Sequence, residues 1–356
     1  MTKYTSSAPR GILRAYPKLS EHLGRVPLLK GPSRVHPLTF GAVDGRPRIW
    51  IKRDDEVASP YGGNKPRKLE FLLYQARLEG SVGLLTTGAM GSNHCLATCL
   101  HGAVSGFQVH LVLSPQPVTD HVRKTLRLFS RHARSLILCP SFAAAPTRMD
   151  EYAREVPDLF VIPAGGSTAL GTVGFVDAAF ELAHQVQSNA LPLPHAILLP
   201  AGTCGTLAGL VLGLKLAGIP SRVIGVRVVD SMITNPTTVV ELARGALGIL
   251  RSAEPKIPEV SVDESDFDLD QDQYGAGYGH STAAGTAAIE GLALSDGISL
   301  EPTYSGKAMA GLIARLPDAT PDRPLLFWNT FAGPVLAEQA REIVDSEVPP
   351  EFRSFL

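Results

Sequence analysis

The sequence predicts an α/β protein built on parallel sheets. Short apolar runs alternate with helix-like stretches over most of the 356 residues, and Gly-rich loops follow several of these runs. This repeated order of strand, loop and helix is typical of parallel sheets with right-handed crossovers. With 44% hydrophobic and 19% charged residues, the chain can bury a sizeable core, and the composition excludes wholesale disorder or a coiled coil.

The expected elements follow in chain order. An apolar run at 82–86 precedes a Gly/Ser loop and a helix-like stretch, and similar runs recur before later helices. The expected strands are 82–86, 108–113, 135–139, 196–199, 222–229 and 325–328. The expected helices are 93–104, 124–134 and 207–217. Ligands of parallel sheets lie beyond the carboxyl ends of the strands. We therefore expect the chemistry in loops 87–94 and 201–206 and in the loop after Trp328.

Charge and cysteine content restrict the partners and the compartment. The 33 Lys and Arg residues against 34 Asp and Glu residues give a net charge of −1, so neither nucleic acid nor an anionic membrane is an expected partner. No apolar run reaches the roughly 18 residues of a membrane span, and the N-terminus lacks a signal-peptide pattern. Four cysteines without zinc spacing indicate reduced thiols in a cytoplasm. A small-molecule enzyme is the expected class.

The most acidic segment, 262–272, resembles the beginning of a calcium loop. Asp266, Asp268 and Asp270 have the right spacing, but Gln271 stands where that loop needs glycine. Gly277 stands where the loop needs a bidentate glutamate. We therefore expect a solvated loop and no metal site.

The segment 61–70 places Lys65 just before the first turn of an expected helix that begins at Pro66. The neighbouring cations Arg67 and Lys68 would depress the pKa of this amine, as a nucleophilic lysine requires. By spacing alone, however, a surface lysine in a cationic turn explains the segment better.

Two strand-to-helix loops have the composition of anion sites. Loop 86–94 would present backbone N–H groups to a substrate carboxylate, although Ser92 or Asn93 could equally be a simple N-cap. Loop 200–209 carries two threonines, a cysteine and several glycines, which suits a phosphate monoester. It lacks the dinucleotide and triphosphate motifs. Loop 164–171 is of similar character.

Tyrosines in the Gly-rich stretch 274–280, with Tyr304 downstream, could offer a phenol to a site. Half-buried core tyrosines are the commoner explanation. A lysine before a helix, a carboxylate-type loop and a phosphate-type loop together indicate pyridoxal 5'-phosphate, which needs a lysine amine, a phosphate site and a partner for its ring nitrogen.

These motifs also occur in a known family. The chain resembles the D-cysteine desulfhydrase and 1-aminocyclopropane-1-carboxylate deaminase family of pyridoxal phosphate enzymes over about residues 51–336. The resemblance is carried by residues 62–70, 92–94, 165–167 with Gly171, 203–206, 278–279 and 304–307. It implies two open twisted α/β domains of the tryptophan-synthase-β type, also called pyridoxal phosphate fold type II, with the cofactor in the cleft between them.

The same resemblance implies a smaller domain at 67–178, a larger domain from 1–66 plus 179–356, and a homodimer. It also assigns roles to single residues. Lys65 would hold the cofactor and move the α-proton, Asn93 would bind the ring hydroxyl, and Ser92 would contact the substrate carboxylate. Catalytic Tyr278 and Tyr304 would line the pocket. The residues that would surround the phosphate are Lys68, Gly202, Thr203, Cys204, Gly205 and Thr206.

Departures from the family pattern favour one branch. The deaminases carry Glu and Leu where this chain has Ser305 and Thr330, which resemble the desulfhydrase side. Hydroxyls at the ring nitrogen would leave the ring neutral, and a neutral ring suits expulsion of a β leaving group. Phe331 replaces a small residue after Thr330, and Cys204 is unusual in a phosphate loop.

The resemblance therefore implies a lyase that converts D-cysteine to pyruvate, sulfide and ammonia. Deamination of 1-aminocyclopropane-1-carboxylate is the main alternative. A wider alternative is elimination or substitution on another β-substituted amino acid such as cysteate. A non-catalytic binding protein with this fold is the rival from another class, and the intact Lys65 argues against it.

Overall fold

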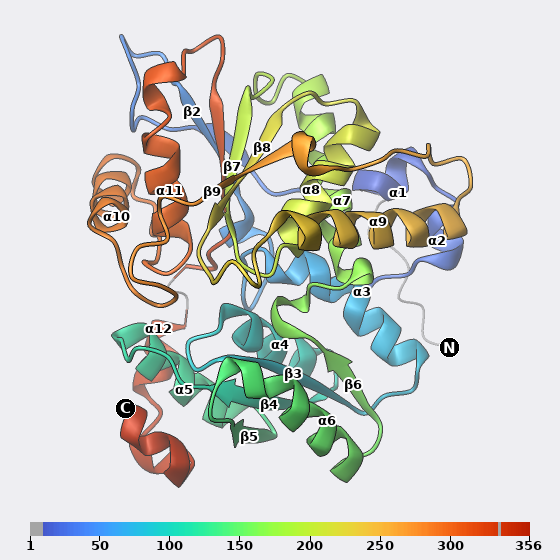
Figure 1. Ribbon diagram of the computed structural model, residues 1–356, viewed down its shortest axis with the longest axis vertical. Helices are drawn as coiled ribbons and strands as arrows, with labels where there is room; N and C mark the ends of the chain where they lie inside the picture. Colours follow the sequence, from blue (N-terminus) through green and yellow to red (C-terminus); the bar gives the residue numbers. More distant parts are fainter. Residues whose placement is uncertain (1–9, 334–335) are drawn as a thin grey trace.

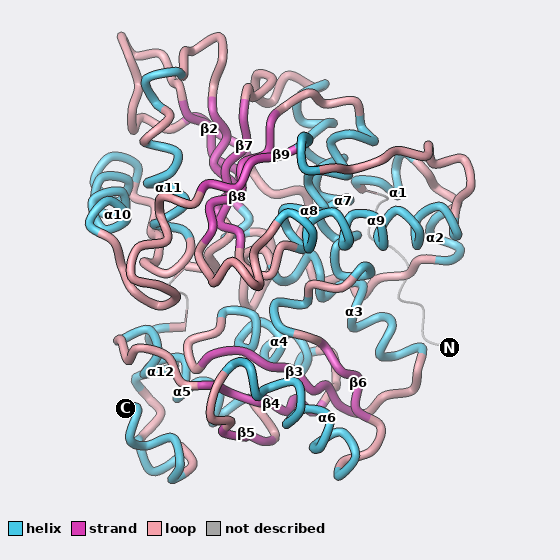
Figure 2. Tube along the Cα trace, viewed as in Figure 1, coloured by secondary structure: helices cyan, strands magenta, loops and turns pink. Residues whose placement is uncertain are grey.

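The computed structural model describes residues 10–333 and 336–356, which form two sheets in separate layers (Figures 1 and 2). Residues 1–9, which belong to the expected larger domain and to the N-terminus judged above, lie outside the described residues, as do residues 334–335. The sheets and their flanking helices confirm the predicted α/β class. No helix in the described part of the chain is long and apolar enough to cross a membrane.

The larger sheet has six strands in the order β1-β2-β10-β7-β8-β9. Only β1 is antiparallel to its neighbour. The strand bounds are β1 Val35–Pro37, β2 Ile49–Arg53, β7 Ala196–Ala201, β8 Arg222–Arg227, β9 Phe267–Asp270 and β10 Leu325–Asn329. Central strands β7 and β10 are buried along their whole length, as expected for parallel strands covered on both faces.

The smaller sheet has four parallel strands in the order β5-β4-β3-β6. Its bounds are β3 Gly83–Ala89, β4 Gln108–Ser114, β5 Ser135–Leu138 and β6 Leu159–Ile162. In Figure 1 this sheet lies in the lower half of the molecule, below the larger one.

The helices cover both faces of each sheet. Successive residues of a strand point to opposite faces, so Ile197 and Leu199 of β7 pack with α7, α8 and α9 while Leu198 packs with α10 and α11. In the smaller sheet, Leu84 faces α4 and α5, and Leu85 faces α6. The helix bounds are α1 Gly11–Ala15, α2 Leu19–His22, α3 Lys65–Leu78, α4 Asn93–Val104, α5 Asp120–His132, α6 Ala145–Glu155, α7 Ala169–Gln187, α8 Gly205–Ala217, α9 Pro236–Ala253, α10 Ala283–Asp296, α11 Ser305–Ile313 and α12 Ala337–Arg341.

All expected strands and helices occur, with small shifts at their ends. The helix expected at 93–104 has these bounds in the structure, whereas the helix expected at 124–134 begins earlier, at Asp120. C-terminal helix α12 packs against α5, beside the smaller sheet. The division into domains at 67 and 178 stays a prediction.

The acidic segment is not a solvated loop, and this expectation was wrong. Its residues 267–270 form β9, an edge strand that pairs with β8. The three carboxylates bind cations of neighbouring elements: Asp266 lies 2.7 Å from Lys215, Asp268 lies 2.6 Å from Arg222, and Asp270 lies 2.6 Å from Arg315. These ion pairs let an acidic strand form, because each charge is compensated across the sheet edge.

Candidate active site

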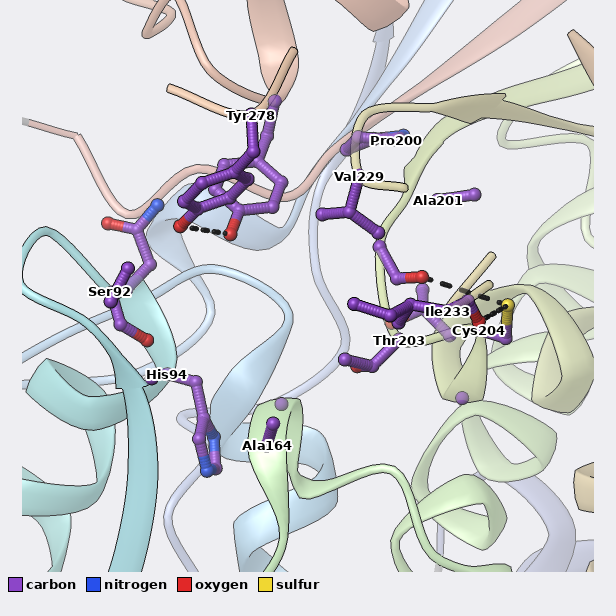
Figure 3. Close-up of a pocket in the computed structure, with 18 of the residues that line it drawn as sticks. Ser92, His94, Ala164, Pro200, Ala201, Thr203, Cys204, Val229, Ile233 and Tyr278 are labelled. Atoms are coloured by element: carbon purple, nitrogen blue, oxygen red, sulfur yellow. Dashed lines mark hydrogen bonds between the residues drawn. The ribbon is translucent and has the colours of Figure 1, made fainter. Parts of the chain in front are cut away.

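A cavity of about 380 Å³ opens where the two sheet layers meet (Figure 3). It receives the loops that follow β3, β7 and β10, as predicted from the rule for parallel sheets. Every candidate site residue from the sequence lines it except Ser305. These residues are Lys65, Lys68, Ser92, Asn93, Gly202, Thr203, Cys204, Gly205, Thr206, Tyr278, Tyr304 and Thr330.

Lys65 is the first residue of α3 and lines this cavity. Burial lowers the pKa of its amine to about 8, so a surface lysine is the wrong interpretation. The cause also differs from the predicted one. The charge of Arg67 is compensated by Asp54 at 2.7 Å and Glu181 at 3.0 Å. Desolvation, rather than the adjacent cation Arg67, therefore lowers the pKa of Lys65.

The low pKa of Lys65 predicts a pH dependence for the cofactor-free protein. An amine attacks an aldehyde only when it is deprotonated, and half of this amine is deprotonated at a pH of about 8. Covalent uptake of pyridoxal phosphate, followed by absorbance in a stopped-flow instrument, should accelerate up to about pH 8 and then level off. Free N-acetyl-lysine is the control. An acceleration that continues to about pH 10.5, the usual lysine pKa, would contradict the prediction.

The second cation of the cavity, Lys68, is buried without a counter-ion among the described residues. Its ammonium group donates to two neutral oxygens, Ser167 Oγ at 3.0 Å and Gly165 O at 3.2 Å. Burial first, and Lys65 second, hold its pKa well below the usual lysine value. The first turn of α8, which begins at Gly205, lies in the same wall. Backbone N–H groups of a helix start and a nearby ammonium group favour a bound anion.

Ser167 joins the two loops around this anion site. Its Oγ lies 2.7 Å from Thr203 Oγ1 and accepts from Gly205 N at 3.3 Å. A Cβ atom on Gly165 would lie 2.1 Å from Thr203 Oγ1, so only glycine allows this close approach. Sequence reasoning noted loop 164–171 without giving Ser167 a role.

Cys204 is the N-cap residue of α8 and has a left-handed backbone with φ of 64°. Burial raises the pKa of its thiol to about 11, so it stays protonated and unreactive near neutral pH. This conformation strains any residue with a Cβ atom but not glycine.

This strain can be measured by comparing two variants. Cys204→Gly and Cys204→Ala both lose the thiol, but only the glycine variant loses the strain. The Cys204→Gly protein should have a free energy of unfolding about 1 kcal/mol higher than Cys204→Ala, measured by urea denaturation. Equal stabilities, or a more stable alanine variant, would show that the left-handed backbone costs nothing here.

The threonines of this loop predict an effect on cofactor affinity. Thr206 Oγ1 accepts from Asn64 Nδ2 at 3.0 Å, which leaves its own proton free for an anion. Losing one hydrogen bond to a charged group costs about 1.5–3 kcal/mol. Thr203→Ala or Thr206→Ala should therefore weaken pyridoxal phosphate binding by about ten- to a hundredfold, measured by fluorescence titration. Exposed Thr237 gives the control variant. Unchanged affinity in both variants would place the phosphate site elsewhere.

The opposite wall is formed by the start of α4. Ser92 is its N-cap, and its Oγ accepts from Cys95 N at 3.2 Å, so the N-cap interpretation is correct. Asn93 Oδ1 accepts from Tyr61 OH at 3.0 Å. Because Ser92 and Asn93 also line the cavity, capping does not exclude their predicted contacts with substrate and cofactor, which remain predictions.

His94 completes the motif and has a defined proton position. Thr86 Oγ1 donates to Ile162 O at 2.7 Å, so it must accept from His94 Nε2 at 2.9 Å. Burial, followed by Lys65 and Lys68, holds the pKa of this imidazole well below its usual value. His94 is therefore neutral and presents an unprotonated Nδ1.

Two tyrosines form the third side of the cavity. Tyr304 OH donates to Tyr278 OH at 2.9 Å, and the rings meet edge to face with centroids 5.8 Å apart. Burial raises the pKa of Tyr278 to about 12, so its phenol keeps its proton near neutral pH. The pair lies in the cavity wall (Figure 3) rather than in the core.

Ser305 lies behind this wall and is fully buried. Its Oγ accepts from Glu301 N at 2.9 Å and lies 3.3 Å from Glu301 Oε1. Glu301 itself lines the cavity, and its carboxylate accepts from three backbone N–H groups at the start of α11. Sequence reasoning missed Glu301, although an acidic residue before a helix is a capping signal. Thr330 and Phe331 line the cavity.

The described residues fit pyridoxal phosphate. The cavity combines an amine of low pKa at Lys65, a cation without counter-ion at Lys68, and a helix start at Gly205. These are the groups that an aldehyde and a phosphate monoester require.

Comparisons with known proteins agree with this assignment. The family model described as "Pyridoxal-phosphate dependent enzyme" matches residues 20–330. The chain is 33% identical over 337 residues to a D-cysteine desulfhydrase of Klebsiella pneumoniae (strain 342), covering 91% of this chain and 92% of that protein. It is 32% identical over 343 residues to the nocardicin C-9' epimerase of Nocardia uniformis subsp. tsuyamanensis, covering 94% and 99%.

Among solved structures, the chain resembles one described as an ACC deaminase homologue. The TM-score is 0.75 at 27% identity, covering 92% of this chain and 98% of that one. A bacterial threonine deaminase structure, from T.th., has a TM-score of 0.61 at 17% identity, covering 89% of this chain and 98% of that one. It shares the fold, which confirms the predicted fold type II.

Proposed function

The chain belongs to the pyridoxal-phosphate dependent enzyme family, and from this premise we propose that it is a lyase that removes the β-substituent of D-cysteine. The products are pyruvate, sulfide and ammonia. The coarser statement, a pyridoxal phosphate enzyme of the D-cysteine desulfhydrase and ACC deaminase group, follows from the comparisons. The observation that carries the proposal is the Lys65 amine beside the anion site at Lys68 in one cavity.

Lys65 would hold the cofactor and then take the α-proton of the substrate. A base works best when its pKa lies near the working pH, and burial sets the pKa of Lys65 at about 8. Pyridoxal phosphate supplies, when bound, an electron sink for the bonds at Cα. The phosphate is assigned to Lys68 and to the loop from Gly202 to Thr206, and the ring hydroxyl to Asn93.

The substrate would lie between the start of α4 and the two tyrosines. Ser92 is assigned to the substrate carboxylate. Tyr304 donates to Tyr278, so the proton of Tyr278 is available for the departing sulfur. Both phenols keep their protons near neutral pH, because burial raises their pKa values. The pair is thus suited to act as a general acid.

Epimerisation is a second candidate, favoured by the similarity to a nocardicin epimerase. It uses the same removal of the α-proton but returns that proton to the other face and breaks no Cβ bond. Deamination of 1-aminocyclopropane-1-carboxylate stays an alternative because of the ACC deaminase homologue. Cysteate is a poorer candidate, since Lys65 and Lys68 are the only lysine or arginine residues among the described cavity-lining residues and both have assigned roles.

A substrate panel on the loaded enzyme tests the proposal. D-cysteine, L-cysteine, β-chloroalanine, cysteate and 1-aminocyclopropane-1-carboxylate are compared for keto-acid release, with sulfide measured in parallel. Equal amounts of pyruvate and sulfide from D-cysteine, at the highest kcat/KM, are expected. Inverted amino acid without keto acid would establish an epimerase, and a faster cyclopropane acid would establish a deaminase.

A cytoplasmic location and a homodimer belong to the same proposal. Cys95, Cys99, Cys139 and Cys204 are all buried free thiols, which supports a reducing compartment. Sedimentation equilibrium of the purified protein decides the oligomeric state.

A further inference from the structure

A second cavity of about 520 Å³ lies beside the candidate active site. The two cavities are continuous, because five residues line both of them: Thr87, Phe142, Ala164, Thr203 and Ile233. Thr87 belongs to β3, five positions before Ser92, so the shared wall begins close to the proposed substrate position. A group attached to the substrate could extend from one cavity into the other.

The wall of the second cavity is suited to a neutral apolar group. Its large side chains are Phe142, Pro146, Met149, Val161, Ile233 and Leu242. The charged residues among the described lining residues are Asp150 and Glu241, and both are exposed carboxylates. No lysine, arginine or histidine occurs among these lining residues. An anionic group would be repelled here, while an apolar group would gain by leaving water.

The common opening also carries exposed apolar side chains. Phe142, from the turn before α6, is 38% exposed, and Met232, from the loop between β8 and α9, is 85% exposed. Both line the active-site cavity, and they come from the two different sheet layers. Large exposed apolar side chains grouped at a cleft mark a binding surface more often than chance does.

We propose that the substrates of this enzyme include cysteine S-conjugates, and that the apolar group on sulfur occupies the second cavity. This inference rests on the proposed function, β-elimination. Lys65 removes the α-proton, the Cβ–S bond breaks, and its electron pair leaves with sulfur. Sulfur gains a proton and departs as the thiol RSH. The three-carbon remainder takes up one water molecule to give pyruvate and ammonium, so no oxidant or reductant is needed.

Binding of an unreactive analogue tests the cavity without turnover. In D-2-amino-5-phenylpentanoate a methylene group replaces the sulfur of S-benzyl-D-cysteine, so no leaving group exists. Calorimetric titration of the loaded enzyme should give a Kd at least about tenfold below that of D-alanine, since tenfold corresponds to about 1.4 kcal/mol. Equal or weaker binding than D-alanine would overturn the proposal.

A pair of valine variants locates the binding site. Val161 lines only the second cavity, whereas Val82 lines neither cavity and is 59% exposed. Val161→Asp should weaken the analogue at least about fivefold relative to D-alanine and lower the ratio of S-benzyl-D-cysteine to D-cysteine kcat/KM equally. Val82→Asp should change neither value. Equal effects of both variants would overturn the assignment.

The two proposals fail in different ways. If D-cysteine and its S-benzyl conjugate release no keto acid, the elimination function is wrong. The analogue affinity and its loss in Val161→Asp then still decide whether the second cavity binds an apolar side chain. If D-cysteine is eliminated but the analogue binds no better than D-alanine, the function stands and the inference about S-conjugates is wrong.

Discussion

Replacement of Lys65 by alanine should reduce turnover of D-cysteine by at least about a thousandfold. General-base catalysis contributes about a hundred- to ten-thousandfold, and this variant also removes the covalent attachment of the cofactor. No other lysine can substitute, because the amine of Lys68 already donates to Ser167 and Gly165. Steady-state kcat on pyridoxal phosphate-saturated protein measures the effect.

Two further measurements make this result specific to Lys65. Lys215 forms an ion pair with Asp266 at 2.7 Å, far from the cavity residues, and Lys215→Ala should keep full activity. A small added amine, such as ethylamine, should restore part of the activity of Lys65→Ala by supplying a base in the vacated space. If Lys65→Ala retains more than about one tenth of wild-type turnover, Lys65 is not the catalytic base.

The double substitution Ser305→Glu with Thr330→Leu should move the enzyme from elimination towards deamination. Hydroxyls at these positions leave the cofactor ring neutral in the proposed arrangement, and a carboxylate would hold a proton there. Charge stabilisation in a dry site is large, so a hundredfold change in preference needs only about 2.7 kcal/mol. The kcat/KM ratio of 1-aminocyclopropane-1-carboxylate to D-cysteine should rise by about that factor.

Glu301 makes a neutral control necessary. Its Oε1 lies 3.3 Å from Ser305 Oγ, so a glutamate at position 305 would stand beside an existing carboxylate. Ser305→Gln with Thr330→Leu matches the shape without the charge and should leave the ratio near the wild-type value. An equal ratio change in both double variants, or no change in the charged one, would show that charge at position 305 does not select the reaction.

The sequence predicted most of the elements that build the active site, because their signals are local. The helix at 93–104 follows a polar N-cap, and Ser92 does cap it. The loop at 201–206 lies between an apolar strand and a helix that begins at Gly205. Parallel strands end at one edge of a sheet, so the order of strands and loops along the chain is enough to place these loops together.

Other features depend on contacts between distant residues and left no local signal. The pKa of Lys65 was attributed to the charge of Arg67, but Arg67 is bound by Asp54 and Glu181 from other elements. The acidic strand β9 forms because Arg222 and Arg315 reach its carboxylates from neighbouring elements. Neither pairing can be derived from residue spacing.

The second cavity shows the same limit. Its walls come from β3, α6, β6 and α9, and from loops between these elements. No single stretch of sequence has the composition of that wall. A cavity between two sheet layers is visible only once the layers are packed together.

Borohydride reduction of the loaded enzyme, followed by peptide mapping, tests the central claim most directly. Reduction makes the bond between cofactor and lysine permanent, and mass spectrometry then locates the phosphopyridoxyl group. The label should be on Lys65, the cavity lysine with a pKa of about 8. A label on Lys68, on Lys307 or on no lysine at all would contradict the assignment of this cavity as the active site.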